Sequence, residues 1–143
     1  MKTFKQFLED IDYRFSHTAP SSKTGNSPLH AVSPNTYPND FHGKDGFHIY
    51  ADYGQPFDRE SYNIIRNAKD KPNAPIKIYR AVPKKTDITE INPGDWVTGS
   101  KQYAHQHGQS VLNGDYKILT KTVPAHHLYT DGNSVHEYGY DPR

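Results

Sequence analysis

The chain of 143 residues contains no cysteine. Disulfides, thiolate nucleophiles and sulfur-ligated zinc are therefore excluded together, and any chemistry must come from oxygen and nitrogen side chains. No apolar run approaches the roughly 18 residues that a membrane span requires, and the N-terminus lacks the basic-then-apolar order of a secretory signal. These absences predict a soluble, cytoplasmic protein.

A dominant charge of either sign is also missing, because 17 basic residues face 16 acidic ones and the two signs are interspersed. The sequence thus lacks the electrostatic signature of a domain that binds duplex nucleic acid. Glycine-rich phosphate loops and internal repeats are absent as well. Because only 33% of the residues are hydrophobic, the core must be small and much of the chain must lie in loops.

Residues 1–15 are expected to form a short amphipathic helix. Apolar side chains recur there with the i, i+3, i+4, i+7 spacing of a helix: Phe4, Phe7, Leu8 and Ile11. The segment resembles the start of internal head proteins of tailed phages, in which a targeting helix is clipped after a glutamate, here Glu9. The alternative is a helix that packs on its own domain.

Residues 16–45 carry four prolines and many small polar residues without any period, so we expect an extended or mobile loop. The domain proper would then span residues 46–143. At its start, "FHIYADY" (residues 47–53) is consistent with a strand or with a loop that lines a site. The following "DRESYNIIRNAKD" (residues 58–70) predicts a helix with Asp58 as its N-cap. Its buried stripe would hold Tyr62, Ile65 and Ala68.

The C-terminal half reads as short strands and turns. Strands are predicted at residues 76–82, 95–100, 115–123 and 134–140. Between them, "KQYAHQHG" fits a short helix that Ser100 caps and Gly108 ends. The order of elements, helices first and a strand-rich body after, predicts an α+β fold.

Two opposite charges fall on strand faces that should point inward. Arg80 alternates with Ile78 and Val82 in "IKIYRAV", and Glu137 shares a face with Val135 in "SVHEY", while His136 and Tyr138 face the other way. A buried charge needs a partner, a ligand or water. Either Arg80 pairs with Glu137 or another carboxylate, or the two strands form the walls of a cleft in which the guanidinium holds a phosphate or carboxylate.

Hydroxyl groups lie between these two charges in the sequence. Trp96, Thr98 and Ser100 share one strand face, so two hydroxyls can point into the same cleft, and Tyr103 follows one turn into the next helix. A pair of hydroxyls and an aromatic ring suit a sugar and a flat heterocycle.

These motifs resemble the NAD-dependent ADP-ribosyltransferase fold of the arginine–serine–glutamate type. "YRAV" is similar to its first motif, "WVTGSKQYA" to its second and "GNSVHEYGY" to its third. "YRAVP", "PGDWVT" and related pieces also resemble phage-associated sequences, some attached to head-morphogenesis proteins. The resemblance covers residues 76–142, about half of the chain. It implies a split pair of small antiparallel sheets with NAD in the cleft between them.

The resemblance assigns a role to five residues. Arg80 would clamp the diphosphate and nicotinamide ribose of NAD, and Thr98 with Ser100 would order the site and Glu137. Tyr103 would stack near the nicotinamide. Glu137 would bind the ribose hydroxyl and stabilise positive charge as nicotinamide departs, so that Glu137, Arg80 and Ser100 are the catalytic residues. The implied activity is mono-ADP-ribosyl transfer from NAD to a host protein or nucleotide, or NAD hydrolysis.

Two features depart from the family pattern. Members that modify arginine carry Glu or Gln two residues before the catalytic glutamate, where this chain has Val135, so an arginine acceptor is not implied. The segment between the first two motifs, residues 81–97, is also shorter than in toxin-like members.

Two other classes of function compete with this one. A histidine metal site is disfavoured, because neither His105 with His107 nor His126 with His127 has a spacing that chelates naturally. A non-catalytic phage internal or virion protein that binds a host target is the alternative to the enzyme. An open cleft lined by the four site residues Arg80, Thr98, Ser100 and Glu137 would favour the enzyme, and a sealed Arg80–Glu137 pair would favour the binder.

Overall fold

The computed structural model describes residues 18–32 and 36–143, so the helix predicted over residues 1–15 lies outside the described part. The helices are α2 (Gly46–Tyr50), α3 (Asp58–Ala68) and α4 (Lys101–Val111). The strands are β1 (Ser27–Pro28), β2 (Pro75–Pro83), β3 (Trp96–Val97), β4 (Tyr116–Pro124), β5 (Leu128–Thr130) and β6 (Tyr138–Tyr140). They form two small antiparallel sheets, so the predicted α+β class is confirmed.

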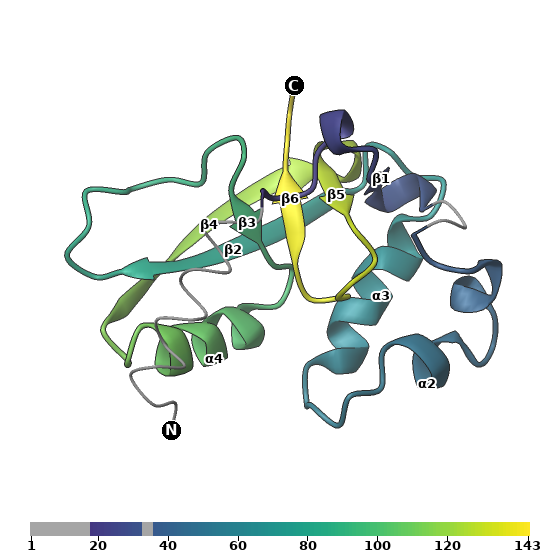
Figure 1. Ribbon diagram of the computed structural model, residues 1–143, viewed down its shortest axis with the longest axis horizontal. Coiled ribbons are helices and arrows are strands. Elements are labelled where there is room, and N and C mark those ends of the chain that lie inside the picture. Colours follow the sequence, from purple (N-terminus) through teal and green to yellow (C-terminus); the bar gives the residue numbers. More distant parts are fainter. Residues whose placement is uncertain (1–17, 33–35) are drawn as a thin grey trace.

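The longest strands, β2 and β4, pair along their whole length from Pro75 opposite Pro124 to Pro83 opposite Tyr116. Both were predicted from their alternation of apolar and polar residues. Ile76, Ile78 and Val82 of β2 are buried on one face, as that alternation requires. Figure 1 shows α4 below the left end of this strand pair and α2 with α3 to its right.

The second sheet has the order β1-β5-β6-β3. It meets β2 at one residue pair, where Tyr79 and Thr98 exchange two backbone hydrogen bonds of 2.8 and 3.0 Å. Strand β3 is shorter than the predicted residues 95–100, because the chain leaves the sheet after Thr98 to begin α4. Strand β6 likewise begins at Tyr138, so Glu137 directly precedes it.

Helix α3 confirms the predicted stripe, since Tyr62, Ile65 and Ala68 are buried. Asp58 is not its N-cap, however. Phe57 occupies that position, and the Asp58 carboxylate instead accepts from the backbone N–H groups of Tyr53 and Gln55, both at 2.8 Å.

Residues 47–53, read as a strand or loop, begin with the short helix α2. Gly46 makes this helix possible, because a Cβ there would lie 2.0 Å from the carbonyl oxygen of Phe41. Close packing on Tyr62, through the ring of Phe47, then outweighs the strand preference of this aromatic stretch.

The described part of residues 16–45 is not an extended loop. It contains β1 and three one-turn 3-10 helices, Ser22–Thr24, Leu29–Ala31 and Asn39–His42. Leu29, Tyr37 and Phe41 from this segment are buried in the core. The apolar residues are spaced too irregularly between prolines to give a period, yet they anchor the segment on the domain. In residues 18–32 and 36–143, no helix has the length and apolar character needed to cross a membrane.

Candidate functional site

A pocket of about 440 Å³ lies between β2, the turn before β3, α4 and Glu137. Four of the five predicted site residues line it: Arg80, Thr98, Tyr103 and Glu137. Apolar side chains from the same elements, including Val82, Val97 and Leu112, make up much of the remaining wall. The pocket is thus lined by residues of both sheets, and Arg80 and Glu137 both contribute to its wall.

Arg80 is half-buried and pairs with Asp95, whose Oδ2 lies 3.1 Å from its Nη1 atom. The same carboxylate oxygen accepts from the backbone N–H of Asn92 at 2.8 Å, which closes the "NPGD" turn. Gly94 in that turn has a φ of 93°, a conformation that favours glycine. The turn thus holds Asp95 against Arg80, so the carboxylate partner of the arginine is Asp95 and not Glu137. Sequence periodicity could not find this pair, because Asp95 lies in a turn.

The Glu137 carboxylate is held by α4. The Tyr103 hydroxyl donates to its Oε1 atom at 2.6 Å. The register that pairs Val97 with Tyr138 also brings Thr98 to the level of Glu137. Tyr103, whose ring was expected to stack near a ligand, thus orients the Glu137 carboxylate through this hydrogen bond.

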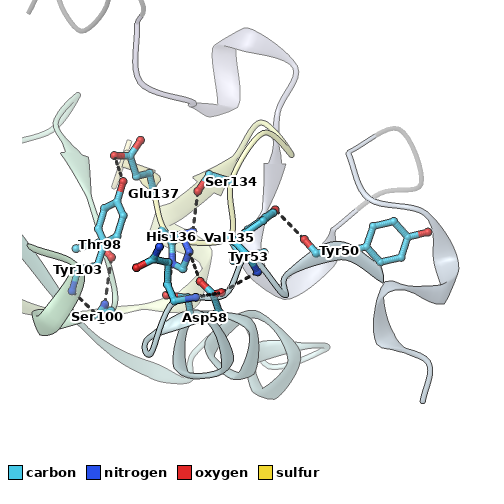
Figure 2. Close-up of polar contacts among 12 residues, drawn as sticks. Tyr50, Tyr53, Asp58, Thr98, Ser100, Tyr103, Ser134, Val135, His136 and Glu137 are labelled. Atoms are coloured by element: carbon cyan, nitrogen blue, oxygen red, sulfur yellow. Dashed lines mark hydrogen bonds and ion pairs between the residues drawn. The ribbon is translucent and has the colours of Figure 1, made fainter. Parts of the chain in front are cut away.

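Ser100 lies outside the pocket lining and is fully buried. Its side chain caps α4 by accepting from the backbone N–H of Tyr103 at 3.1 Å, which confirms the predicted cap. The hydroxyl of Thr98 accepts in turn from the Ser100 N–H at 3.1 Å. Figure 2 shows this series of contacts, from Thr98 through Ser100 and Tyr103 to Glu137. Ser100 can thus order the site only through α4.

A buried polar cluster that the sequence did not reveal lies behind Glu137. The His136 Nδ1 atom is 2.8 Å from the Ser61 hydroxyl, and its Nε2 atom is 3.0 Å from Asp58 Oδ1. Burial lowers the pKa of His136 below its usual value, and the charge of Asp58 opposes that shift. Asp58 and Ser61 are spaced i, i+3 on α3, so the sequence does indicate that these two polar side chains lie on the same face of the helix.

The residue types of this cluster match a serine hydrolase triad, but its geometry does not. Ser61 is fully buried on α3 and is not part of the pocket wall. A nucleophile must reach a substrate, so the cluster has no such role.

His107 also lines the pocket, one turn beyond Tyr103 on α4, and was not assigned to the site from sequence. His105 points elsewhere and lies 2.7 Å from the Tyr116 hydroxyl through Nδ1. The two histidines thus diverge, as their i, i+2 spacing predicts. Within the described ranges, no three His, Cys, Asp or Glu side chains are grouped so as to hold a metal ion.

No family model, curated protein or solved structure matches the chain. The interpretation of the site therefore depends on its own residues: one cation with a carboxylate partner, a second carboxylate bonded to a tyrosine, and an apolar wall.

Proposed function

We propose that the chain is an NAD-dependent mono-ADP-ribosyltransferase. The observation that carries the proposal is that Arg80 of β2 and Glu137, directly before β6, line one pocket while Arg80 takes Asp95 as its ion-pair partner. The glutamate is therefore not neutralised by the arginine. Among the described residues, the pocket wall thus carries a guanidinium and a carboxylate that do not pair with each other, and these can hold the anionic and the reacting parts of a dinucleotide at different points.

Arg80 would bind the diphosphate of NAD. Its Nη1 atom engages Asp95, and the guanidinium carries further N–H groups that suit a phosphate oxygen. The apolar wall offers a surface for a flat ring, and Val82 and Leu112 contribute to it. About 440 Å³ lies within the usual range of pockets for small ligands.

Glu137 would act on the bond between nicotinamide and ribose. When that bond breaks, its electron pair leaves with nicotinamide, and positive charge develops on the ribose ring. A carboxylate fixed beside the ribose stabilises this charge, which is largest in the transition state. The acceptor then forms a bond to the same carbon and loses a proton. A host protein or nucleotide is the proposed acceptor, and water as acceptor would give NAD hydrolysis.

Release of nicotinamide from NAD by the purified protein, alone and with cell lysate, tests the proposal. We expect Glu137→Ala to lower the rate by about 10²–10³-fold, because it removes an electrostatic group at the reacting centre. Glu90→Ala is the matched control, since Glu90 is an exposed glutamate that is not part of the pocket lining. Mass spectrometry of lysate proteins would detect the added ADP-ribose. Equal rates for wild type and Glu137→Ala, together with no binding of labelled NAD, would refute the proposal.

The Arg80–Asp95 ion pair favours a second candidate, a non-catalytic protein that binds a host target. An arginine that already has a carboxylate partner can be a structural element of the pocket wall. Binding of NAD without release of nicotinamide in any lysate would favour this candidate over the enzyme.

A further inference from the structure

The Tyr103 side chain that donates a hydrogen bond to the Glu137 carboxylate is itself packed between other rings. Tyr103, which donates to Glu137, is stacked on the imidazole of His136 with ring centroids 4.9 Å apart and an interplanar angle of 12°. Phe57 packs edge-on against both rings, at 5.5 Å from Tyr103 and 5.1 Å from His136. The position of the tyrosine ring is thus limited by His136 on one face and by Phe57 at the edge.

His136 is itself held from α3. The Ser61 hydroxyl lies 2.8 Å from Nδ1 and Asp58 Oδ1 lies 3.0 Å from Nε2. All three side chains are buried, with exposed fractions of 6% for His136, 1% for Asp58 and 0% for Ser61. If the serine donates to Nδ1, the neutral imidazole carries its proton on Nε2, toward the carboxylate.

Asp58 is anchored at its other oxygen. Its Oδ2 atom accepts from the N–H groups of Tyr53 and Gln55, each at 2.8 Å, so the carboxylate cannot turn without breaking two backbone hydrogen bonds. Figure 2 shows His136 directed toward Asp58 and the neighbouring Glu137 directed toward Tyr103. The two consecutive side chains therefore link α3 to the pocket wall.

We propose that His136, fixed by Ser61 and Asp58, is a positioning residue for Glu137. It acts through its stacking on Tyr103 and through the backbone that joins it to Glu137, and it does not touch the substrate. The proposal rests on the proposed function for its kinetic part, because the carboxylate that it positions is the one assigned to the reaction. A shift of the tyrosine by about 1 Å can lower the rate of a positioned reaction up to about 100-fold.

Ser61→Ala is the primary test, because it releases one edge of the imidazole and adds no bulk. Tyr62→Phe is the matched control, since it also removes one buried hydroxyl from α3, where Tyr62 donates to the carbonyl of Phe41. We expect Ser61→Ala to lower kcat for nicotinamide release about tenfold with KM changed less than twofold. Tyr62→Phe should keep the wild-type kcat at temperatures where it is folded.

A second readout needs no turnover. The carbon-13 signals of the Glu137 carboxylate and of Tyr103 Cζ report the hydrogen bond between them. Ser61→Ala should shift both signals, and Tyr62→Phe should leave both at their wild-type positions. If Ser61→Ala does not fold, Asp58→Asn takes its place, because its amide oxygen can still accept from the two backbone N–H groups, whereas its NH2 group cannot accept a hydrogen bond from His136 Nε2–H.

The outcomes separate the two proposals. Wild-type carbon-13 signals and wild-type kcat in Ser61→Ala would overturn the positioning role while the proposed function stands. Absence of nicotinamide release in the wild-type protein would overturn the proposed function, and shifted carbon-13 signals would still support the positioning of Glu137.

Discussion

Replacing Ser100 by alanine tests whether this residue serves the fold or the ligand. The Ser100 side chain accepts from the Tyr103 N–H at 3.1 Å as the N-cap of α4, and it is fully buried outside the pocket lining. If the residue acts only as a cap, Ser100→Ala should lower the free energy of unfolding and leave the ligand contacts in place.

The expected size follows from two effects. Loss of an N-cap serine costs about 1 kcal/mol, within a range of about 0.5–2. Ser100 itself is inaccessible, so water cannot readily replace its hydroxyl, and an unsatisfied buried N–H costs about 1–3 kcal/mol. We therefore expect a loss of about 2 kcal/mol, which lowers the melting temperature of a domain of this size by about 5 °C.

Urea unfolding followed by circular dichroism measures this loss, with Ser110→Ala as the control on the same helix. Ser110 donates to the carbonyl of Gln106 on an exposed face, so its replacement should change the free energy of unfolding by less than about 0.5 kcal/mol. Two results would refute the reasoning. One is a wild-type urea midpoint for Ser100→Ala, and the other is a loss of NAD binding without a loss of stability.

Two further predictions concern stability. Burial lowers the pKa of His42, His127 and His136 in the folded state. On unfolding, the pKa of each histidine returns to about 6.5, so the unfolded state binds more protons than the folded state as the pH falls below that value. The urea midpoint should therefore fall as the pH drops from 7 to 5. A constant or rising midpoint over this interval would contradict the burial of these histidines. Gly139→Ala should lower the free energy of unfolding by about 3 kcal/mol, because the added Cβ would lie 1.8 Å from the carbonyl oxygen of Pro20. An unchanged melting temperature in a thermal scan would show that Pro20 and Gly139 are not in contact.

The elements that could be predicted are those whose own residues carry a period. β2, β4, α3 and the start of α4 have regular apolar spacing or a capping serine, and each lies where that pattern predicts. The predicted end of α4 at Gly108 is wrong, because the helix continues to Val111 and this glycine instead leaves room for the Tyr116 ring, which a Cβ would approach to 2.4 Å.

Strand parity holds for Arg80, which lies within β2 and lines the pocket. It does not explain Glu137, because β6 begins only at Tyr138 and Val135, His136 and Tyr138 are all buried, so the predicted alternation over residues 134–138 is wrong.

What could not be predicted depends on contacts between distant segments. Asp95 reaches Arg80 only because a turn folds it back, and no spacing rule connects the two. Helix α2 contradicts the local strand preference of "FHIY", since its conformation depends on the close approach of Gly46 to Phe41. The role of His136 likewise appears only once α3 lies beside it.

The contact between Tyr79 and Thr98 has a mechanical consequence. Among the described residues, this one β-bridge is the backbone pairing between the β2–β4 strand pair and the four-stranded sheet, and Tyr79 and Thr98 both line the pocket. Side chains add to this bridge, since Lys121 of β4 lies over the Tyr140 ring of β6, 5.1 Å from its centroid. The relative position of the two sheets beside the pocket therefore depends on side-chain packing more than on backbone pairing, and substitutions at these side chains should change the shape of the pocket without removing a sheet hydrogen bond.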